Sequence, residues 1–492
     1  MDNMKRYTNI IVLFLAFSIS SCQDWINVEP QNSVVLEDFW KSKDDIESAL
    51  AGTYVELREP SDRFLLWGEI LRSPSFEIGG NNTGSIVVDA EKIMRLQITS
   101  ENIHSDWNGL YKIIHLANNV IKYAPTVRDN DLSLSEKELN AYLSEAYFIR
   151  SLCYYYLVRT FKDIPFPLEP SDTDDIEFFL PKTDDATILD KLIEDMEWAE
   201  RYAPKSFANI EYDKGRATKA AAQALLADLY LWVGRYDDCL LMCDKLINQS
   251  SHALLPGDRW FQIFSKGNTN EGIFEIQYDA SRSQSNVLST WMFNNIGSRN
   301  SAYVLREETL ELYDKTDARG EGKTFMKDNL TLWKYIGLEE DNSSRFRTIG
   351  NNDANIILYR YADILLMKAE ALVEKGDFFA AQAEYNKIRD RANLPSKIFP
   401  NDRHIAEDLI LEERTREFIG EGKRWFDILR FAKRNDFERK QMLIDILTAN
   451  VDPQELPKWK SLLSNPMGYY LPIHYDEVRN NSKLEQNPYY AR

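Results

Sequence analysis

Two stretches of this chain repeat the same helix–turn–helix spacing, and this repeat constrains the fold more than any other feature. The stretch "AQALLADLYLWVGRYDDCLLMCDKLI" can be aligned with "ILLMKAEALVEKGDFFAAQAEYNKIRDRANLP" by setting Gly234 on Gly376. Ala227 then falls on Ala369. Small residues at such positions let two antiparallel helices approach closely, and a glycine ends the first of them. The sequence therefore predicts stacked helix pairs.

This spacing resembles the tetratricopeptide repeat, and weaker helix pairs can be assembled elsewhere in the chain. The predicted pairs lie near residues 39–57 with 106–124, 136–161 with 187–203, 216–250 and 357–394, and the helix near 106–124 should end at Pro125. A further pair is expected near 403–419 and 421–433.

The segments between these helices are too long to be simple connections. They lie near 60–105, 162–185, 251–355 and 436–492. We predict a mainly α fold in one domain, residues 22–492. A tetratricopeptide-like scaffold of four helix pairs lies beside an irregular, loop-rich companion subdomain that is poor in regular α and β structure. This companion subdomain includes most of the C-terminal region 403–492. The insertions near 60–105 and 251–355 are where function should be sought, because binding residues concentrate on irregular segments.

The start of the chain reads as a targeting segment. Lys5 and Arg6 precede an apolar run over residues 10–19, which is typical of a secretory signal and too short to span a bilayer. The residues "ISS" before Cys22 resemble a bacterial lipobox, in which the cysteine is acylated after cleavage. We predict a signal peptide over 1–21 and a lipid anchor at Cys22; the alternative is ordinary secretory cleavage beside a chance cysteine.

Charge and cysteine content exclude several function classes. The net charge of −19 and the absence of a basic cluster argue against nucleic acid as a partner. Cys239 and Cys243 stand four residues apart, on one helical face, which favours core packing over metal or redox chemistry. Together with Cys153 they are expected to be free, buried thiols.

No motif supports catalysis or a cofactor. The string "ARGEGKT" lacks the first glycine of a phosphate-binding loop, because Asp317 stands there. No histidine pair with zinc-ligand spacing, no CxxC and no GxSxG occurs, so we predict no catalytic residue, no metal and no cofactor. The dense charges of "LEERTREFIGEGKRWFDILR" are predicted as helix ion pairs. These pairs are Glu412 with Arg416, and Asp427 with Arg424 and Arg430.

A set of strings, in fixed order behind the lipobox, resembles the SusD/RagB-like lipoproteins of Gram-negative outer membranes. They include "VEPQNSVVLEDFW", "EAYFIRSLCYYYLVRTFKDIPF", "KGRATKAAAQALLADLYLWVGRYDDC", "EGIFEIQY", "ELYDKTDARG", "LYRYADILLMKAEAL", "YNKIRDRANLP", "LEERTREFIGEGKRWFDILR" and "YYLPIHYDEVRNNSKLEQNPYY". One departure is Lys162, where many members carry a glycine. The resemblance implies four tetratricopeptide-like helix pairs. It also implies a surface-exposed, lipid-anchored outer-membrane protein that binds oligosaccharides without hydrolysing them and passes them to a SusC-like TonB-dependent transporter.

Sugar binding directs attention to aromatic rings beside amide and guanidinium groups, because rings cover the apolar faces of sugars while hydroxyl groups need fixed polar partners. Two stretches satisfy this, "FLLWGEILRSPSFEIGGNN" and "SRSQSNVLSTWMFNNIGSRNSAY". The predicted ligand-binding residues are Trp67, Arg72, Phe76, Asn81 and Asn82 in the first, and Asn286, Trp291, Phe293, Asn294 and Tyr303 in the second.

Trp67 could equally be a buried anchor of its loop. Other large aromatic residues are assigned to the core or to structural roles. These are Trp107, Trp198, Trp232, Trp425, Trp333 and Tyr335. Two other functions stay open beside the glycan receptor: a surface glycoside hydrolase, and a helical-repeat adaptor that binds peptides or proteins.

Overall fold

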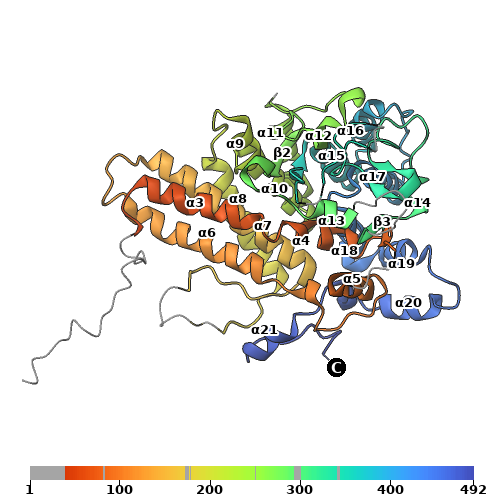
Figure 1. The fold of residues 1–492 in the computed structure, drawn as a ribbon, viewed down its shortest axis with the longest axis horizontal. Helices are drawn as coiled ribbons and strands as arrows, with labels where there is room; N and C mark the ends of the chain where they lie inside the picture. Colours follow the sequence, from red (N-terminus) through yellow and green to blue (C-terminus); the bar gives the residue numbers. More distant parts are fainter. Residues whose placement is uncertain are drawn as a thin grey trace, which may run out of the picture.

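Stacked helices form the scaffold of the protein. The structure, a computed structural model, describes residues 39–80, 84–171, 177, 179–249, 251–292, 301–340, 344–348 and 350–491; the predicted signal peptide and Cys22 lie outside them. The four helix pairs are α3 (Lys43–Leu57) with α6 (Asn108–Val127), α7 (Glu136–Phe161) with α8 (Asp185–Tyr202), α10 (Lys219–Val233) with α11 (Tyr236–Ile247), and α15 (Tyr361–Glu374) with α16 (Phe378–Arg391). Each packs on the next, from α3 at the left of Figure 1 to α16 at its upper right. The predicted mainly α, tetratricopeptide-like fold is confirmed.

The aligned glycines end their helices as the repeat predicts. The Thr218 side chain caps α10 by accepting from Ala221 N–H, and the following Ala- and Leu-rich run is almost wholly buried. Gly234 then adopts a φ of +80°, and Gly376 after α15 adopts +81°. A left-handed residue at this position satisfies the last helical carbonyls and turns the chain back, and glycine does so without strain.

Two helix ends differ from what local rules suggest. α6 does not stop at Pro125 as predicted but continues to Val127, because a proline in the last turn removes one hydrogen bond without blocking the residues after it. α7 ends at Lys162, which has a φ of +71° although it is not glycine. Its ammonium group lies 2.7 Å from Asp185, the first residue of α8.

The rest of the chain forms an irregular companion region of mostly short elements, and its two longest helices lie where the further pair near 403–419 and 421–433 was predicted. Its helices are α4 (Ser61–Leu65), the π-helix η1 (Leu66–Ile70), α5 (Ser85–Met94), α9 (Ile210–Gly215), α12 (Gln262–Ser265), α13 (Leu288–Met292), α14 (Glu307–Leu310), α17 (Arg403–Phe418), α18 (Arg424–Phe437), α19 (Lys440–Thr448), α20 (Leu456–Leu463) and α21 (Tyr475–Asn480). Three antiparallel two-stranded sheets pair β1 (Phe76–Ile78) with β3 (Tyr303–Leu305), β2 (Gly272–Ile276) with β6 (Ile356–Arg360), and β4 (Phe325–Met326) with β5 (Thr331–Leu332).

A buried network of ion pairs holds segments of this region together, and Arg391 of α16 connects the network to the scaffold through Glu271 at 3.3 Å and through Glu417. Arg360, at the end of β6, donates to Glu271 and Glu421 at 2.8 Å and to Glu417 at 2.5 Å, and all four side chains are fully buried. Arg319 bridges Glu417 at 2.7 Å from a third segment. Removing one partner of such a pair is strongly destabilising, because it leaves an uncompensated buried charge.

Some of the side chains predicted to form helix ion pairs are buried in this interior. Arg416 pairs with Glu412 as predicted, and Arg430 lies 2.8 Å from Asp427. Asp427 is 2% exposed and also accepts from Arg414, so it is a core residue rather than part of a solvated face. Arg424 differs from the prediction, because its guanidinium donates to the carbonyl of Leu411.

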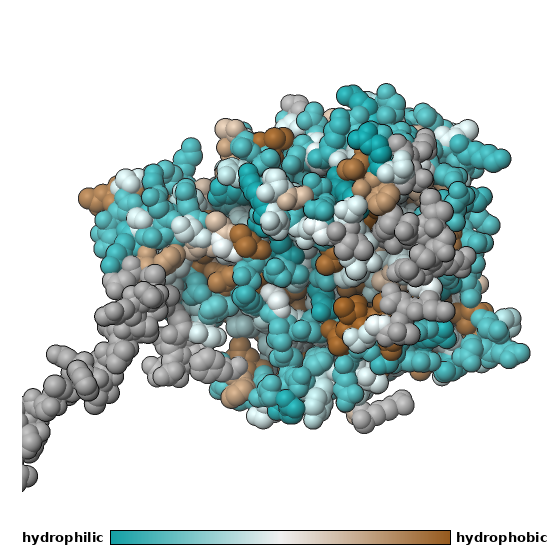
Figure 2. Space-filling model, in the orientation of Figure 1, coloured by the Kyte–Doolittle hydropathy of each residue, from teal (hydrophilic) through white to brown (hydrophobic). Residues whose placement is uncertain are grey.

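The predicted core assignments largely hold. Cys153, Cys239 and Cys243 are free and buried, which confirms the prediction. Trp107, Trp232, Trp425, Trp333 and Tyr335 are at most 3% exposed, and Trp198 is partly buried against the smaller of two apolar clusters. Hydrophilic side chains cover most of the face shown in Figure 2, with small separate hydrophobic patches. No described helix combines the length and the apolar character needed to cross a bilayer.

Candidate functional site

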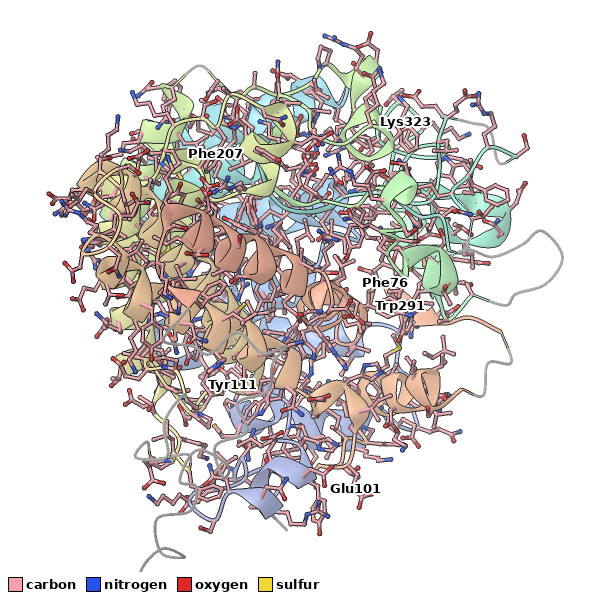
Figure 3. All side chains as sticks on the ribbon, turned by 60° about the vertical axis from the view of Figure 1, so that its left-hand side comes forward. Phe76, Glu101, Tyr111, Phe207, Trp291 and Lys323 are labelled. Atoms are coloured by element: carbon pink, nitrogen blue, oxygen red, sulfur yellow. The ribbon has the colours of Figure 1, made fainter. Side chains whose placement is uncertain are left out.

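The two stretches predicted to bind ligand come together in space. β1 from the first stretch pairs with β3 from the second, with Phe76 opposite Leu305 and Ile78 opposite Tyr303. Gly79 extends the ladder by donating its N–H to the carbonyl of Ala302 at 3.1 Å. α13 (Leu288–Met292), which carries Trp291, contacts β3, and Figure 3 labels Phe76 and Trp291 in this part of the molecule. Insertions more than 200 residues apart in sequence therefore build one unit.

Most of the predicted stacking rings are not accessible in this unit. Trp67 is 2% exposed, and its indole N–H donates to the carbonyl of His104 at 2.8 Å. Phe76 and Tyr303 are 1% and 0% exposed, and Trp291, 7% exposed, packs edge-on against Tyr303 at 5.9 Å. The expectation that these four rings are open for stacking is wrong. Trp67 packs against Phe161 of α7 at 5.3 Å, while Phe76 and Tyr303 lie on the paired strands and Trp291 packs on Tyr303. Phe76 nevertheless belongs to the lining of the cleft described below.

The predicted polar residues act within the protein. Asn286 is 8% exposed, and its side chain accepts from Leu288 N–H at 3.0 Å and donates to the carbonyl of Ala354 at 2.6 Å. It therefore closes a turn. The remaining predicted residues Asn81, Asn82, Phe293 and Asn294 lie outside the described part of the chain and stay predictions.

Arg72 braces the first insertion against the C-terminal region. Its guanidinium donates to the carbonyls of Gly468 and Tyr470 at 3.3 Å, contacts the carbonyl of Tyr469, and lies over the ring of Trp425 at 5.3 Å. Burial lowers the pKa of Arg72, since a charged group loses hydration there. The side chain holds two segments together nearly 400 residues apart in sequence.

A large cleft lies beside this brace. It has a volume of about 980 Å³ and is lined by residues of the first insertion between Leu71 and Gln97, residues of the C-terminal region between Leu447 and Tyr469, Arg306 and Trp425. In Figure 1 these walls carry α5 and α20, at the lower right. Small-molecule sites are usually concave and of this size, with apolar surface and a few converging polar groups.

Trp459 is the aromatic residue best placed to use this cleft. It lies on α20, lines the cleft and is only partly buried, whereas Trp425 in the same lining is 2% exposed. Exposed polar residues of the same wall surround it, namely Asn450, Asp452, Glu455 and Lys458. An aromatic face beside amide and charged groups can cover an apolar sugar face while its hydroxyls find hydrogen-bond partners.

Trp459 was missed because α20 belongs to the long C-terminal segment, which aligns with no repeat. The available signal was local: in "LPKWKSLL" the tryptophan stands between two lysines. A tryptophan in a polar setting is a better candidate for a surface platform than one in an apolar run.

A second cleft, of about 530 Å³, lies along α17 and α19. Its charged groups already satisfy one another: Arg439 lies 2.6 Å from Asp408, and Glu438 accepts from Arg403 at 2.5 Å. Its lining contains no tryptophan, tyrosine or phenylalanine, so it offers no ring to cover a sugar face, and the larger cleft is the better candidate.

Two carboxyl groups with a raised pKa lie outside the larger cleft. Burial raises the pKa of Glu69 to about 7 and that of Glu407 to about 8. Glu69 is enclosed, since it accepts the N–H groups of Gly420 and Gly422, and Glu407 is held by Arg439 at 2.8 Å. A glycosidase needs a carboxylic acid with raised pKa at the scissile bond. Neither of these carboxyls lines the cleft.

Comparisons with known proteins agree with this architecture. The pattern of the SusD family matches residues 330–490, and a second family pattern, described as starch-binding associating with outer membrane, matches residues 25–231. SusD-like protein P25 of Formosa agariphila is 26% identical, with 98% of each chain covered. Starch-binding protein SusD of Bacteroides thetaiotaomicron is 30% identical over 28% of this chain and 22% of its own length.

Solved structures share the fold. A SusD superfamily protein from Bacteroides vulgatus has a TM-score of 0.75 at 22% identity, covering 92% of this chain and all of that one. Surface glycan-binding protein A from Bacteroides uniformis has a TM-score of 0.74 at 23% identity, covering 91% and 100%. A structure described as a laminarin binding SusD-like protein has a TM-score of 0.71 at 20% identity, covering 91% and 99%.

Proposed function

This chain is a member of the SusD/RagB family, and on that premise we propose that it binds oligosaccharides non-catalytically in the cleft beside Trp459. The observation that carries this proposal is the position of Trp459. Its ring is only partly buried, it lines a cleft of about 980 Å³, and exposed amide and charged side chains lie next to it. The descriptions of similar proteins as starch-, glycan- or laminarin-binding support a carbohydrate ligand.

The proposal includes an outer-membrane location and a transporter partner. Acylation of Cys22 would anchor the mature chain at the cell surface, and about twenty residues separate this cysteine from the start of α3. Such a segment reaches at most ~70 Å, enough to let the binding region meet a neighbouring membrane protein. A SusC-like TonB-dependent transporter would then receive the bound oligosaccharide.

Calorimetric titration with a panel of oligosaccharides tests the binding role. The soluble chain without residues 1–22 retains every described residue. Trp459→Ala should weaken binding by about 5- to 30-fold, since stacking on an aromatic ring contributes roughly 1–2 kcal/mol. The matched control is Phe379→Ala, which removes an aromatic ring that is 84% exposed on α16, outside the cleft.

Equal affinities of the Trp459→Ala and control variants would exclude this cleft as the site. The hydrolase alternative is tested by incubating the protein with each bound glycan and measuring new reducing ends, which the proposal expects to stay at background. Pull-down of the transporter from solubilised outer membranes tests the partner.

A further inference from the structure

The lining of the larger cleft contains equal numbers of acidic and basic side chains. Among the described residues it contains four acidic side chains, Glu77, Glu91, Asp452 and Glu455, and four basic ones, Arg72, Arg95, Arg306 and Lys458. The formal charges therefore cancel inside the cleft, although the whole chain carries −19.

Each basic group of this lining already has a partner. Arg95 lies 2.8 Å from Glu91, and Lys458 lies 3.5 Å from Glu455. Arg306 donates to the carbonyl of Phe76 at 3.2 Å.

The same guanidinium of Arg306 lies 4.0 Å from Glu77. Arg72, the fourth base, is committed to main-chain carbonyls. The described lining thus holds no cation free to receive a carboxylate or sulfate.

We infer that this cleft, given the proposed carbohydrate-binding role, selects uncharged oligosaccharides and rejects glycans rich in uronic acid or sulfate. An anionic sugar could compete for an exposed cation such as Arg95, because exposed ion pairs are weak. The carboxylate it displaces would stay beside it in the same cleft, so the exchange leaves an excess negative charge. Like charges placed together are costly, and the acidic chain adds repulsion at longer range.

A neutral sugar meets no such penalty. Its hydroxyl groups can donate to Asp452 or Glu455 and accept from Lys458 or Asn450 while the charge of the cleft stays zero. Affinity for a neutral ligand should also change little with salt, because no net charge is neutralised on binding.

The test compares neutral with acidic probes on the soluble chain without residues 1–22. Laminarihexaose, maltohexaose and xylohexaose represent neutral glycans, and hexagalacturonic acid and a sulfated carrageenan hexasaccharide represent acidic ones. We expect the best neutral probe to bind at least about tenfold more tightly than either acidic probe. An acidic probe that binds as well as the best neutral one, with affinity that falls as salt is added, would overturn the inference and leave the proposed function standing.

Failure of every neutral and acidic probe to bind would overturn the proposed function and this inference together. A charge-changing variant gives an independent measurement. Glu77→Gln with Glu91→Gln removes the partners of Arg306 and Arg95 without removing side-chain volume. Affinity for hexagalacturonic acid should rise about tenfold and become salt-sensitive. An unchanged affinity would show that these charges do not set selectivity, and circular dichroism verifies that the variant is folded.

Discussion

Substitution of Glu417 by glutamine tests whether charge in the buried network stabilises the fold. Its carboxylate accepts from Arg360 at 2.5 Å, from Arg319 at 2.7 Å and from Arg391, and it is fully buried. Glu417→Gln keeps the shape of the side chain and removes its charge. Three guanidinium groups then lose a charged acceptor in the interior.

The expected loss can be worked from these contacts. A hydrogen bond to a charged group contributes about 1 kcal/mol more than a neutral one, so three such bonds give about 3 kcal/mol. Loss of one partner from a buried ion pair typically costs roughly 3–5 kcal/mol. We expect the free energy of unfolding to fall by about 3–5 kcal/mol.

The assay is denaturant unfolding at neutral pH followed by circular dichroism, with the slope of the transition compared as well as its midpoint. The matched control is Glu412→Gln on the same helix, because Glu412 is 47% exposed and pairs with Arg416 at the surface. The control should change stability by less than about 0.5 kcal/mol. If Glu417→Gln costs no more than the control, the buried charges contribute little and the packing of α17 alone accounts for its stability.

The pH dependence of this site has a definite sign. The surrounding arginines hold the pKa of Glu417 well below its ordinary value of 4.5. A carboxyl with a lowered folded-state pKa contributes stability above its unfolded pKa and loses it as pH falls through the folded value. The stability of the wild-type protein should therefore fall progressively as the pH drops below 4.5 toward the folded pKa of Glu417, and the glutamine variant should lack this part of the pH dependence.

Three further predictions address individual side chains. Trp291→Ala should lower stability by roughly 3–5 kcal/mol in thermal unfolding, since the ring is packed against Tyr303; an unchanged melting temperature with lost glycan binding would restore its predicted ligand role. Lys162→Gly should be about 1 kcal/mol more stable than Lys162→Ala in urea, because both lose the pairing with Asp185 and only glycine relieves the positive φ; equal stabilities would contradict this. Burial raises the pKa of Glu69 to about 7, so the stability that this protonated carboxyl contributes is complete below its ordinary pKa of 4.5 and is lost as pH rises through 7. Glu69→Gln should therefore flatten the pH dependence of the free energy of unfolding between pH 4.5 and 7. An unaltered profile in denaturant titrations would refute the raised pKa of Glu69.

The helical scaffold was predictable because its signals are local. The paired glycines Gly234 and Gly376 and the small residues before them specify a close helix pair within about 35 residues. α7 occupies Glu136–Phe161, the range predicted from its helical pattern, and in the structure Ser135 caps it by accepting from Glu138 N–H. The end of α6 was misplaced because Pro125 disfavours a helix without forbidding its last turn.

The candidate site was much less predictable, because its geometry depends on contacts between distant segments. An irregular pattern around Trp67 and Trp291 was interpreted as ligand-binding loops, yet Trp67 packs on Phe161 of α7, Trp291 packs on Tyr303 of β3, and both rings are buried. The contact of Arg72 with the carbonyl of Gly468 crosses 396 residues. No periodicity within one segment reports such a contact, and for the same reason the spacing of Asp427 from its predicted arginine partners did not reveal that Asp427 is buried and also pairs with Arg414.

The division between a rigid interior and an adjustable cleft explains how one fold can serve different ligands. Arg360 and Glu417 lie where several segments meet, so a change at either disturbs the scaffold. Asn450, Asp452 and Lys458 are exposed on the cleft wall, where substitutions usually change stability by less than about 0.5 kcal/mol. Ligand selectivity can therefore change on the walls at small cost, while the contacts of Arg72 with the carbonyls of Gly468 and Tyr470 hold the two walls together. Selectivity in this protein should accordingly follow the charges and rings of α5 and α20 rather than the helix pairs of the scaffold.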